Sequence, residues 1–154
     1  MSVHQTTIIW ERKGQAFNTK TYCRDHLIRL QDGQMIAASG AAANLPPGTV
    51  GAQTADPEEL FVASLASCHM LWFLAIAARK RFVIDHYEDR AFGEMANEDG
   101  IAWMQRVHLR PRVQFSGDKQ PTTEQLIAIH DQAHQRCFIA NSVKTDVSVE
   151  PHFE

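Results

Sequence analysis

The chain has 154 residues, a formal net charge of −3 and three cysteines. Its length fits a single domain that can bury a core. Because it has neither a basic block nor an acidic tail, we expect no nucleic-acid partner. Its start, Met1 to Gln5, has no basic or apolar leader pattern. We therefore expect a cytoplasmic protein with reduced thiols.

The first third of the chain predicts strands and a long loop. β-branched, aromatic or alternating residues predict strands over Thr6–Trp10, Lys20–Leu30 and Met35–Ala38. The segment Ser39–Ala55 is rich in Gly, Ala and Pro and predicts a loop. Arg24 lies within the second strand. The pattern leaves open whether it is buried beside a carboxylate or lies in water at a sheet edge.

A long helix is predicted from Asp56 to Arg81. Asp56 can cap its first turn, Pro57 suits the first helical position, and Glu59 completes a capping box. Leu60–Ala78 is apolar on all sides, so the helix is buried in a core or in a membrane. Polar residues near its centre favour the core of a soluble protein: Ser64, Ser67, Cys68 and His69.

The second half of the chain returns to strands around a second helix, so the element order predicts an α+β fold. One strand carries a basic row on one face, which favours a solvated sheet face over an anion site. Pro111 makes that strand an edge strand or a bulged one. The predicted elements are strand Phe82–Phe92, turn Glu94–Gly100, strand Ile101–Phe115, helix Pro121–Cys137 and strand Val143–Glu150, and the basic row is Arg106, His108, Arg110 and Arg112 with Gln114.

Two of the cysteines lie on the buried faces of the two predicted helices. Cys68 is inside the first helix and Cys137 closes the second. If the helices pack together, the thiols can meet, as a redox enzyme requires when one thiol attacks and the other resolves. Buried cysteines are also common as small core residues, so this alternative stays open.

A metal site is the second candidate. His130, His134 and Cys137 stand at i, i+4 and i+7, on roughly one helix face. Cys68 or His69 could complete four ligands. The signal is weak, because the sequence contains neither a CxxC nor an HExxH motif. Histidines at this helical spacing are more often surface or core residues than metal ligands.

Two segments carry a resemblance to a known family. Asp56-Pro57-Glu58-Glu59-Leu60, leading to Ser67-Cys68-His69-Met70, resembles the central helix of the OsmC/Ohr family of osmotically inducible and organic hydroperoxide resistance proteins. Ala133–Cys137, followed by a strand within Ser142–Glu150, resembles its second cysteine segment. The chain departs from the family at Asp56, where Asn is usual, and at Phe138, where Pro is common.

The resemblance implies one domain over residues 1–154, with antiparallel sheets wrapped around a long central helix and a second helix, in an intertwined homodimer. It also implies a thiol peroxidase that reduces organic hydroperoxides in oxidative stress defence. Cys68 would react with the peroxide and Cys137 would resolve the product. Arg24, oriented by Glu58, would stabilise the thiolate, with Arg12 as the second choice for the arginine.

The implied enzyme needs no bound cofactor or metal. An external dithiol must restore the thiols, and a lipoyl-type dithiol is a candidate. We expect apolar surroundings to favour a hydrophobic peroxide: Phe61, Leu65, Trp72 and Phe138. Two alternatives on the same fold are a protein that binds a hydrophobic ligand and a metal-binding protein.

The spacing within the first helix bears on the dimer. Glu58 and Cys68 are ten residues apart, which is about 15 Å along a straight helix. An arginine held by Glu58 can hardly reach Cys68 of the same chain over that distance. We therefore expect a second copy of the chain to complete the site.

Overall fold

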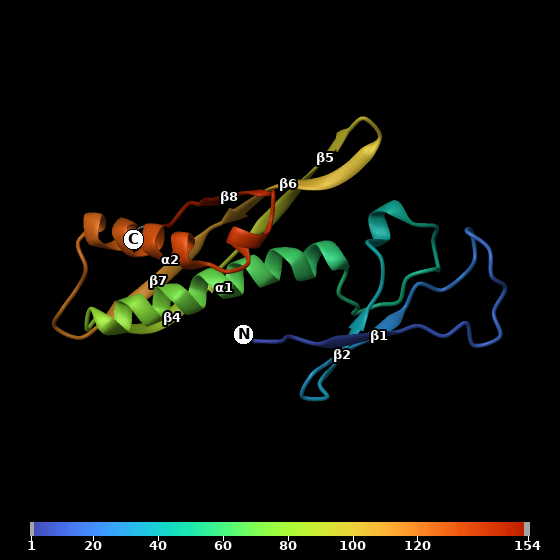
Figure 1. Cartoon of the computed structure of the whole chain (residues 1–154), viewed down its shortest axis with the longest axis horizontal. Coiled ribbons are helices and arrows are strands. Elements are labelled where there is room, and N and C mark those ends of the chain that lie inside the picture. The colour runs from blue at the N-terminus through green and yellow to red at the C-terminus, as the bar shows by residue number, and fades with distance from the viewer. Residues whose placement is uncertain (1, 153–154) are drawn as a thin grey trace. The chain divides into compact units, whose positions relative to one another are not determined.

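The computed structural model describes residues 2–152 and forms two compact units, Met1–Leu60 and Phe61–Glu154. Each unit is described by itself. The elements are α+β, as the sequence predicts, with two α-helices and strand pairing that is antiparallel except between β6 (Ile101–Leu109) and β8 (Asp146–Val149) (Figure 1). The single-domain assignment stays a prediction.

The first unit contains a three-stranded antiparallel sheet. Strands β1 (Thr6–Ile9), β2 (His26–Leu30) and β3 (Met35–Ala38) follow one another in the sheet in chain order. Gly33, with φ of 92°, lies in the reversal between β2 and β3, where a side chain would be strained. The loop beyond β3 contains a short 3-10 helix, Ala42–Asn44. The predicted strands Thr6–Trp10 and Met35–Ala38 are confirmed within a residue.

The predicted strand Lys20–Leu30 is wrong over its first half. β2 begins only at His26, and the preceding residues bond to the loop beyond β3. The Arg24 N–H donates to the Thr49 carbonyl at 2.9 Å, and the Gly51 N–H donates to the Asp25 carboxylate at 2.8 Å. These bonds satisfy the backbone outside the sheet, so the alternating sequence pattern there does not produce a strand.

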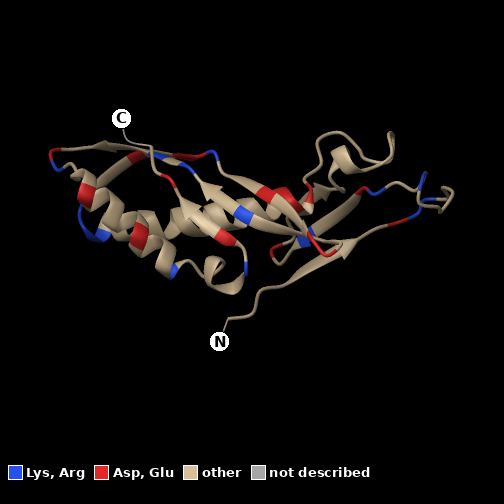
Figure 2. Cartoon of the chain, turned by 90° about the horizontal axis from the view of Figure 1, so that it is seen from above, with Lys and Arg blue, Asp and Glu red and all other residues tan. Residues whose placement is uncertain are grey.

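Helix α1 spans Pro57–Arg79. The Glu59 N–H donates to Asp56 Oδ1 at 2.7 Å, and the Asp56 N–H donates to Glu59 Oε2 at 3.2 Å, so the predicted capping box is formed. Figure 2 shows few charged residues along the middle of helix α1. Among the described residues, α1 is the one helix long and apolar enough to cross a bilayer, a test that core helices of soluble proteins also pass.

The second unit pairs its strands in two sheets. One sheet joins β4 (Val83–Asp89) to β7 (Pro111–Ser116), antiparallel. In the other, β6 (Ile101–Leu109) lies between β5 (Phe92–Glu98), antiparallel, and β8 (Asp146–Val149), parallel. Side chains of α1 and α2 and the residue before β4 form one buried cluster: Phe73, Ile76, Ala77, Phe82, Ile129 and Ala133. Side chains of β4 and β7 pack against it: Ile84, Tyr87, Val113 and Phe115.

Two sequence predictions are corrected in this unit. The predicted turn Glu94–Gly100 is mostly strand β5, because pairing with β6 supplies its hydrogen bonds. Only Asp99 and Gly100, with φ of 52° and 82°, form the reversal. The predicted strand Ile101–Phe115 is divided at Arg110. Pro111 has no N–H to donate, and the chain passes there from one sheet to the other.

Helix α2 spans Thr123–Arg136, and Thr122 with Gln125 forms the predicted capping box. Cys137 ends the helix, and a short 3-10 helix, Ala140–Ser142, follows it. The last strand, β8, is shorter than the predicted Val143–Glu150 because its pairing with β6 begins only at Asp146, opposite Arg106. In Figure 1 the two helices of this unit run beside each other, with Cys137 at the end of α2 that leads into the turn.

Candidate active site

The structure brings the two helical cysteines together. Cys68 is half-buried on α1 and Cys137 is buried at the end of α2. Burial raises the pKa of Cys137, and Cys68 is near enough to raise it further. The rings of Trp72 and Phe138, which follow the two cysteines in the chain, have centroids 5.6 Å apart. Both thiols are free in this structure. Neighbouring thiols on two packed helices are candidates for a disulfide.

The environment of Cys137 holds its thiol protonated. Burial raises its pKa to about 11, and the neighbouring Cys68 acts in the same direction. The Ala140 N–H, 3.4 Å from Cys137 Sγ, acts in the opposite direction. The Asn141 side chain anchors the turn by donating to the Cys137 carbonyl at 2.9 Å. Cys137 therefore has the character of a buried partner thiol, while Cys68 is the more exposed of the two.

Two buried histidines, one next to Cys68 on α1 and one on α2, also form a pair. His69 Nε2 and His130 Nδ1 are 3.0 Å apart, and the two rings are stacked with planes 4° apart. Burial lowers the pKa of His69 to about 4, with the charge of His134 adding to the effect, and lowers the pKa of His130 to about 3. Both imidazoles are therefore neutral at pH 7. Their hydrogen bond joins α1 to α2, and on α1 it involves the residue that follows Cys68.

Arg24 and Glu58 belong to the first unit. The Arg24 guanidinium donates to the carbonyls of Tyr22 at 3.1 Å and Thr19 at 3.0 Å, and it lies 4.2 Å from the centre of the Tyr22 ring. Among the described residues 2–152, no ion pair joins Arg24 to Glu58, which is exposed. The role of Glu58 as a partner of Arg24 stays a prediction.

Arg24 lines an apolar cavity of the first unit with a volume of about 580 Å³. Three aromatic rings form one side of it, because Trp10, Phe17 and Tyr22 contact one another with centroids 5.4 to 6.2 Å apart. The cavity places a guanidinium within an apolar surface. That combination suits a ligand with a hydrophobic body and one polar group. Arg12, the second choice, bonds to the Gln15 carbonyl in an exposed turn.

Two other predictions bear on the site. Cys23 is half-buried in the first unit, where its thiol donates a hydrogen bond to Asp25. Across residues 2–152, no group of three or more His, Cys, Asp or Glu side chains is arranged to hold a metal ion. The alternative with His130, His134 and Cys137 as ligands therefore gains no support.

The family comparison agrees with this geometry. The family model described as OsmC-like protein matches residues 50–152, which include both helices and both helical cysteines. The chain belongs to the OsmC family. Its membership supports a peroxide-related or redox role. No curated protein matches the chain.

Solved structures show the same fold. An OsmC-like protein of unknown function from Vibrio cholerae is 42% identical, with a TM-score of 0.95 over 99% of this chain and 100% of that one. The organic hydroperoxide resistance protein of Bacillus subtilis is 19% identical, with a TM-score of 0.69 over 98% of each chain. One from Elizabethkingia anophelis is 16% identical, with a TM-score of 0.69 over 98% of this chain and 94% of that one.

Sequence reasoning missed how the histidines of this OsmC-family chain are used. It treated His69 as a possible metal ligand and His130 as a possible ligand or an ordinary surface or core residue, whereas they bond to each other. The signal was present, because His130 follows Ile129 on the buried stripe of α2. Only the packing of the helices shows that the two imidazoles meet.

Proposed function

We propose that this protein is a thiol-dependent peroxidase that reduces organic hydroperoxides to alcohols as part of oxidative stress defence. The observation that carries the proposal is that Cys68 and Cys137 are neighbours on two packed helices, where burial raises the pKa of Cys137 and Cys68 is near enough to raise it further. The half-buried Cys68 is the reacting thiol and the buried Cys137 is the resolving thiol.

The chemistry balances in three steps. The Cys68 thiolate attacks the terminal oxygen of the hydroperoxide, the O–O bond breaks, and the alkoxide leaves as an alcohol after taking a proton. Cys68 becomes a sulfenic acid. The Cys137 sulfur then attacks the Cys68 sulfur, a disulfide forms, and water leaves. An external dithiol, for which a lipoyl-type compound is a candidate, reduces the disulfide and becomes a disulfide itself.

Arg24 is the proposed electrostatic partner of the reaction. A guanidinium can stabilise a thiolate and donate hydrogen bonds to a peroxide oxygen. The aromatic cavity that it lines supports a hydrophobic substrate over hydrogen peroxide. Glu58 is the proposed residue that orients Arg24 in the catalytically competent homodimer, which we place in the cytoplasm.

The test is mass spectrometry of the intact protein after one equivalent of an alkyl hydroperoxide. We expect a mass loss of two hydrogens and, after digestion, a peptide pair joined through Cys68 and Cys137. The matched control is Cys23→Ser, which should give the same cross-link. Unmodified Cys68 after this treatment would contradict the peroxidase and favour a protein that only holds a hydrophobic ligand in the cavity.

A further inference from the structure

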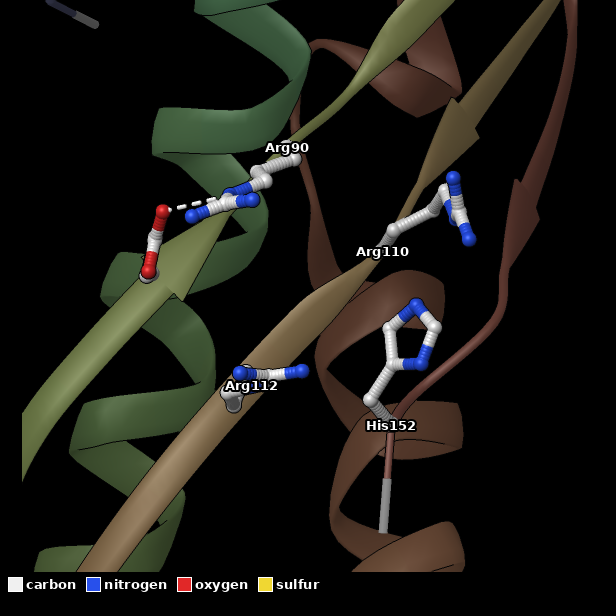
Figure 3. Close-up of a pocket in the computed structure, with 5 residues that line it drawn as sticks. Arg90, Arg110, Arg112 and His152 are labelled. Carbon is white, nitrogen blue, oxygen red and sulfur yellow. Dashed lines mark hydrogen bonds and ion pairs between the residues drawn. The ribbon is translucent and has the colours of Figure 1, made fainter. Parts of the chain in front are cut away.

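A recess in the second unit gathers positive charge on a chain that is negative overall. Its volume is about 180 Å³, and its lining residues are Glu88, Arg90, Arg110, Arg112 and His152. Three arginines against one glutamate leave the recess with a formal charge of +2, whereas the whole chain carries −3. These residues come from β4, from β7, from the links between strands and from the end of the described chain (Figure 3).

Backbone pairing fixes the recess in place. Glu88 of β4 pairs with Arg112 of β7, and Arg112 forms a bridge to His152. The His152 N–H also donates to the Pro111 carbonyl at 2.9 Å. In Figure 3 the Arg112 side chain extends from β7 toward the imidazole of His152, and the Arg110 side chain extends on the same side, above that ring. Arg90 turns the other way, toward the carboxylate on β4. The fold therefore places Arg110 and Arg112 on one side of the recess, next to His152.

The recess lies on the sheet face opposite the helices. Tyr87 and Val113 pack against the core cluster of α1 and α2. Because successive side chains of a strand point to opposite faces, their neighbours Glu88 and Arg112 point away from that core. This site is therefore separate from the cysteine pair and does not depend on the proposed peroxidase activity.

Two arginines of the recess differ in how they are paired among the described residues. Arg90 is paired with Glu88, whose Oε1 lies 2.7 Å from Arg90 Nε. The Arg110 guanidinium makes no hydrogen bond or ion pair with the described residues 2–152. The pKa of the Glu150 carboxyl is lowered mainly by its hydrogen bond with His108 and also by the charge of Arg110. Arg110 therefore presents a guanidinium whose donors are free for a ligand.

These features specify the ligand chemistry. A guanidinium presents parallel N–H donors that match the oxygens of a phosphoryl group. The volume is smaller than the roughly 300–1,000 Å³ of pockets that enclose drug-sized ligands, so it fits one charged group better than a whole large molecule. We propose that this recess binds a phosphoryl group, either as free phosphate or as the end of a small phosphomonoester.

Isothermal titration of the full chain at low salt with inorganic phosphate tests the proposal. We expect saturable binding that weakens as sodium chloride is added, because the contact is ionic. Arg110→Gln should weaken binding about tenfold or more. Arg110→Lys keeps the charge but loses the parallel N–H donors of the guanidinium, so it should weaken phosphate binding less. The matched control is Arg106→Gln, an exposed arginine on β6 outside the recess, which should bind as the wild type does.

A second variant gives a result that damage to the fold cannot produce. Glu88→Gln removes the carboxylate that competes for Arg90, so phosphate should bind more tightly. A small phosphomonoester such as glycerol 3-phosphate identifies the source of the group: tighter binding than phosphate supports an ester, and weaker binding supports free phosphate. No binding at millimolar phosphate, equal losses in Arg110→Gln and Arg106→Gln, or tighter binding of a dicarboxylate would overturn the proposal.

Discussion

His69 and His130 form a buried hydrogen bond of 3.0 Å between neutral imidazoles, one on α1 and one on α2. Each outer ring nitrogen, Nδ1 of His69 and Nε2 of His130, is buried and has no hydrogen-bond partner among the described residues. Protonation of either ring would place a charge in the core with little to compensate it. The pair therefore makes the packing of the two helices dependent on pH.

The free energy of unfolding should fall as the pH drops below neutrality. In the unfolded chain both histidines take up protons near pH 6.5, whereas in the folded chain their pKa values are about 4 and about 3. The unfolded state thus binds more protons between pH 6.5 and about 4. In that range each histidine lowers the free energy of unfolding by up to about 1.4 kcal/mol per pH unit. Above pH 6.5 neither histidine contributes to the pH dependence. Urea unfolding from pH 7.5 to 4.5 measures the free energy of unfolding over this range.

The control for that prediction uses single substitutions. His130→Gln keeps a hydrogen-bonding side chain but does not titrate, so the slope between pH 6.5 and 4.5 should fall by about half. His86→Gln, at an exposed position of β4, should leave the slope unchanged. An unfolding free energy that is flat over this range in the wild type would contradict the assignment of the buried pair.

The two helical cysteines should behave differently when each is replaced. Cys68→Ser should abolish consumption of an alkyl hydroperoxide, because the reacting sulfur is missing. Cys137→Ser should complete one turnover and stop with Cys68 as a sulfenic acid, which a dimedone adduct detects by mass spectrometry. Sustained turnover by Cys137→Ser with a dithiol would show that Cys137 is not the resolving thiol.

Cys23 should be dispensable for activity. It lies in the first unit, and its thiol bonds to the carboxylate of Asp25. Cys23→Ala should retain most peroxide consumption, with a loss of stability of at most about 2–3 kcal/mol. Steady-state peroxide assays and thermal unfolding measure the two effects. A loss of activity as deep as that of Cys68→Ser would mean that the reactive pair is wrongly assigned.

Arg24 should accelerate the oxidation of Cys68. Arg24→Met removes the guanidinium from the aromatic cavity, and we expect at least about a tenfold slower reaction with an alkyl hydroperoxide. Glu58→Gln should have a smaller effect, because it only loosens the arginine. The pH dependence of Cys68 alkylation separates loss of thiolate from loss of substrate binding. Arg12→Met is the matched control, and a larger effect there would transfer the role to Arg12.

The chain should function as a homodimer. The first unit buries few side chains and exposes large apolar ones that a second copy can cover: Ile8, Trp10, Phe17, Leu27 and Met35. We expect a dimer in sedimentation at micromolar concentration. Mixing inactive Cys68→Ser chains with inactive Arg24→Met chains during refolding should restore part of the activity. A monomer, or no recovery when hybrid dimers form, would contradict the shared site.

The sequence predicts the parts of this protein that depend on neighbouring residues. Both capping boxes, Asp56 with Glu59 and Thr122 with Gln125, are formed as predicted. Each joins residues three apart, so the pattern alone specifies it. The motifs around Cys68 and Cys137 likewise indicate the family, and the apolar helix indicates a central element.

Tertiary structure decides what depends on residues far apart in the chain. The segment before β2 is not a strand because a loop some 25 residues away satisfies its backbone, as in the bond from Arg24 to Thr49. The contact of Cys68 with Cys137 and that of His69 with His130 exist because α1 and α2 pack together. The arginine recess forms where three chain segments meet, those that contain Glu88, Arg110 and His152. Such contacts depend on which distant segments come together, and a local pattern of residues does not contain that information.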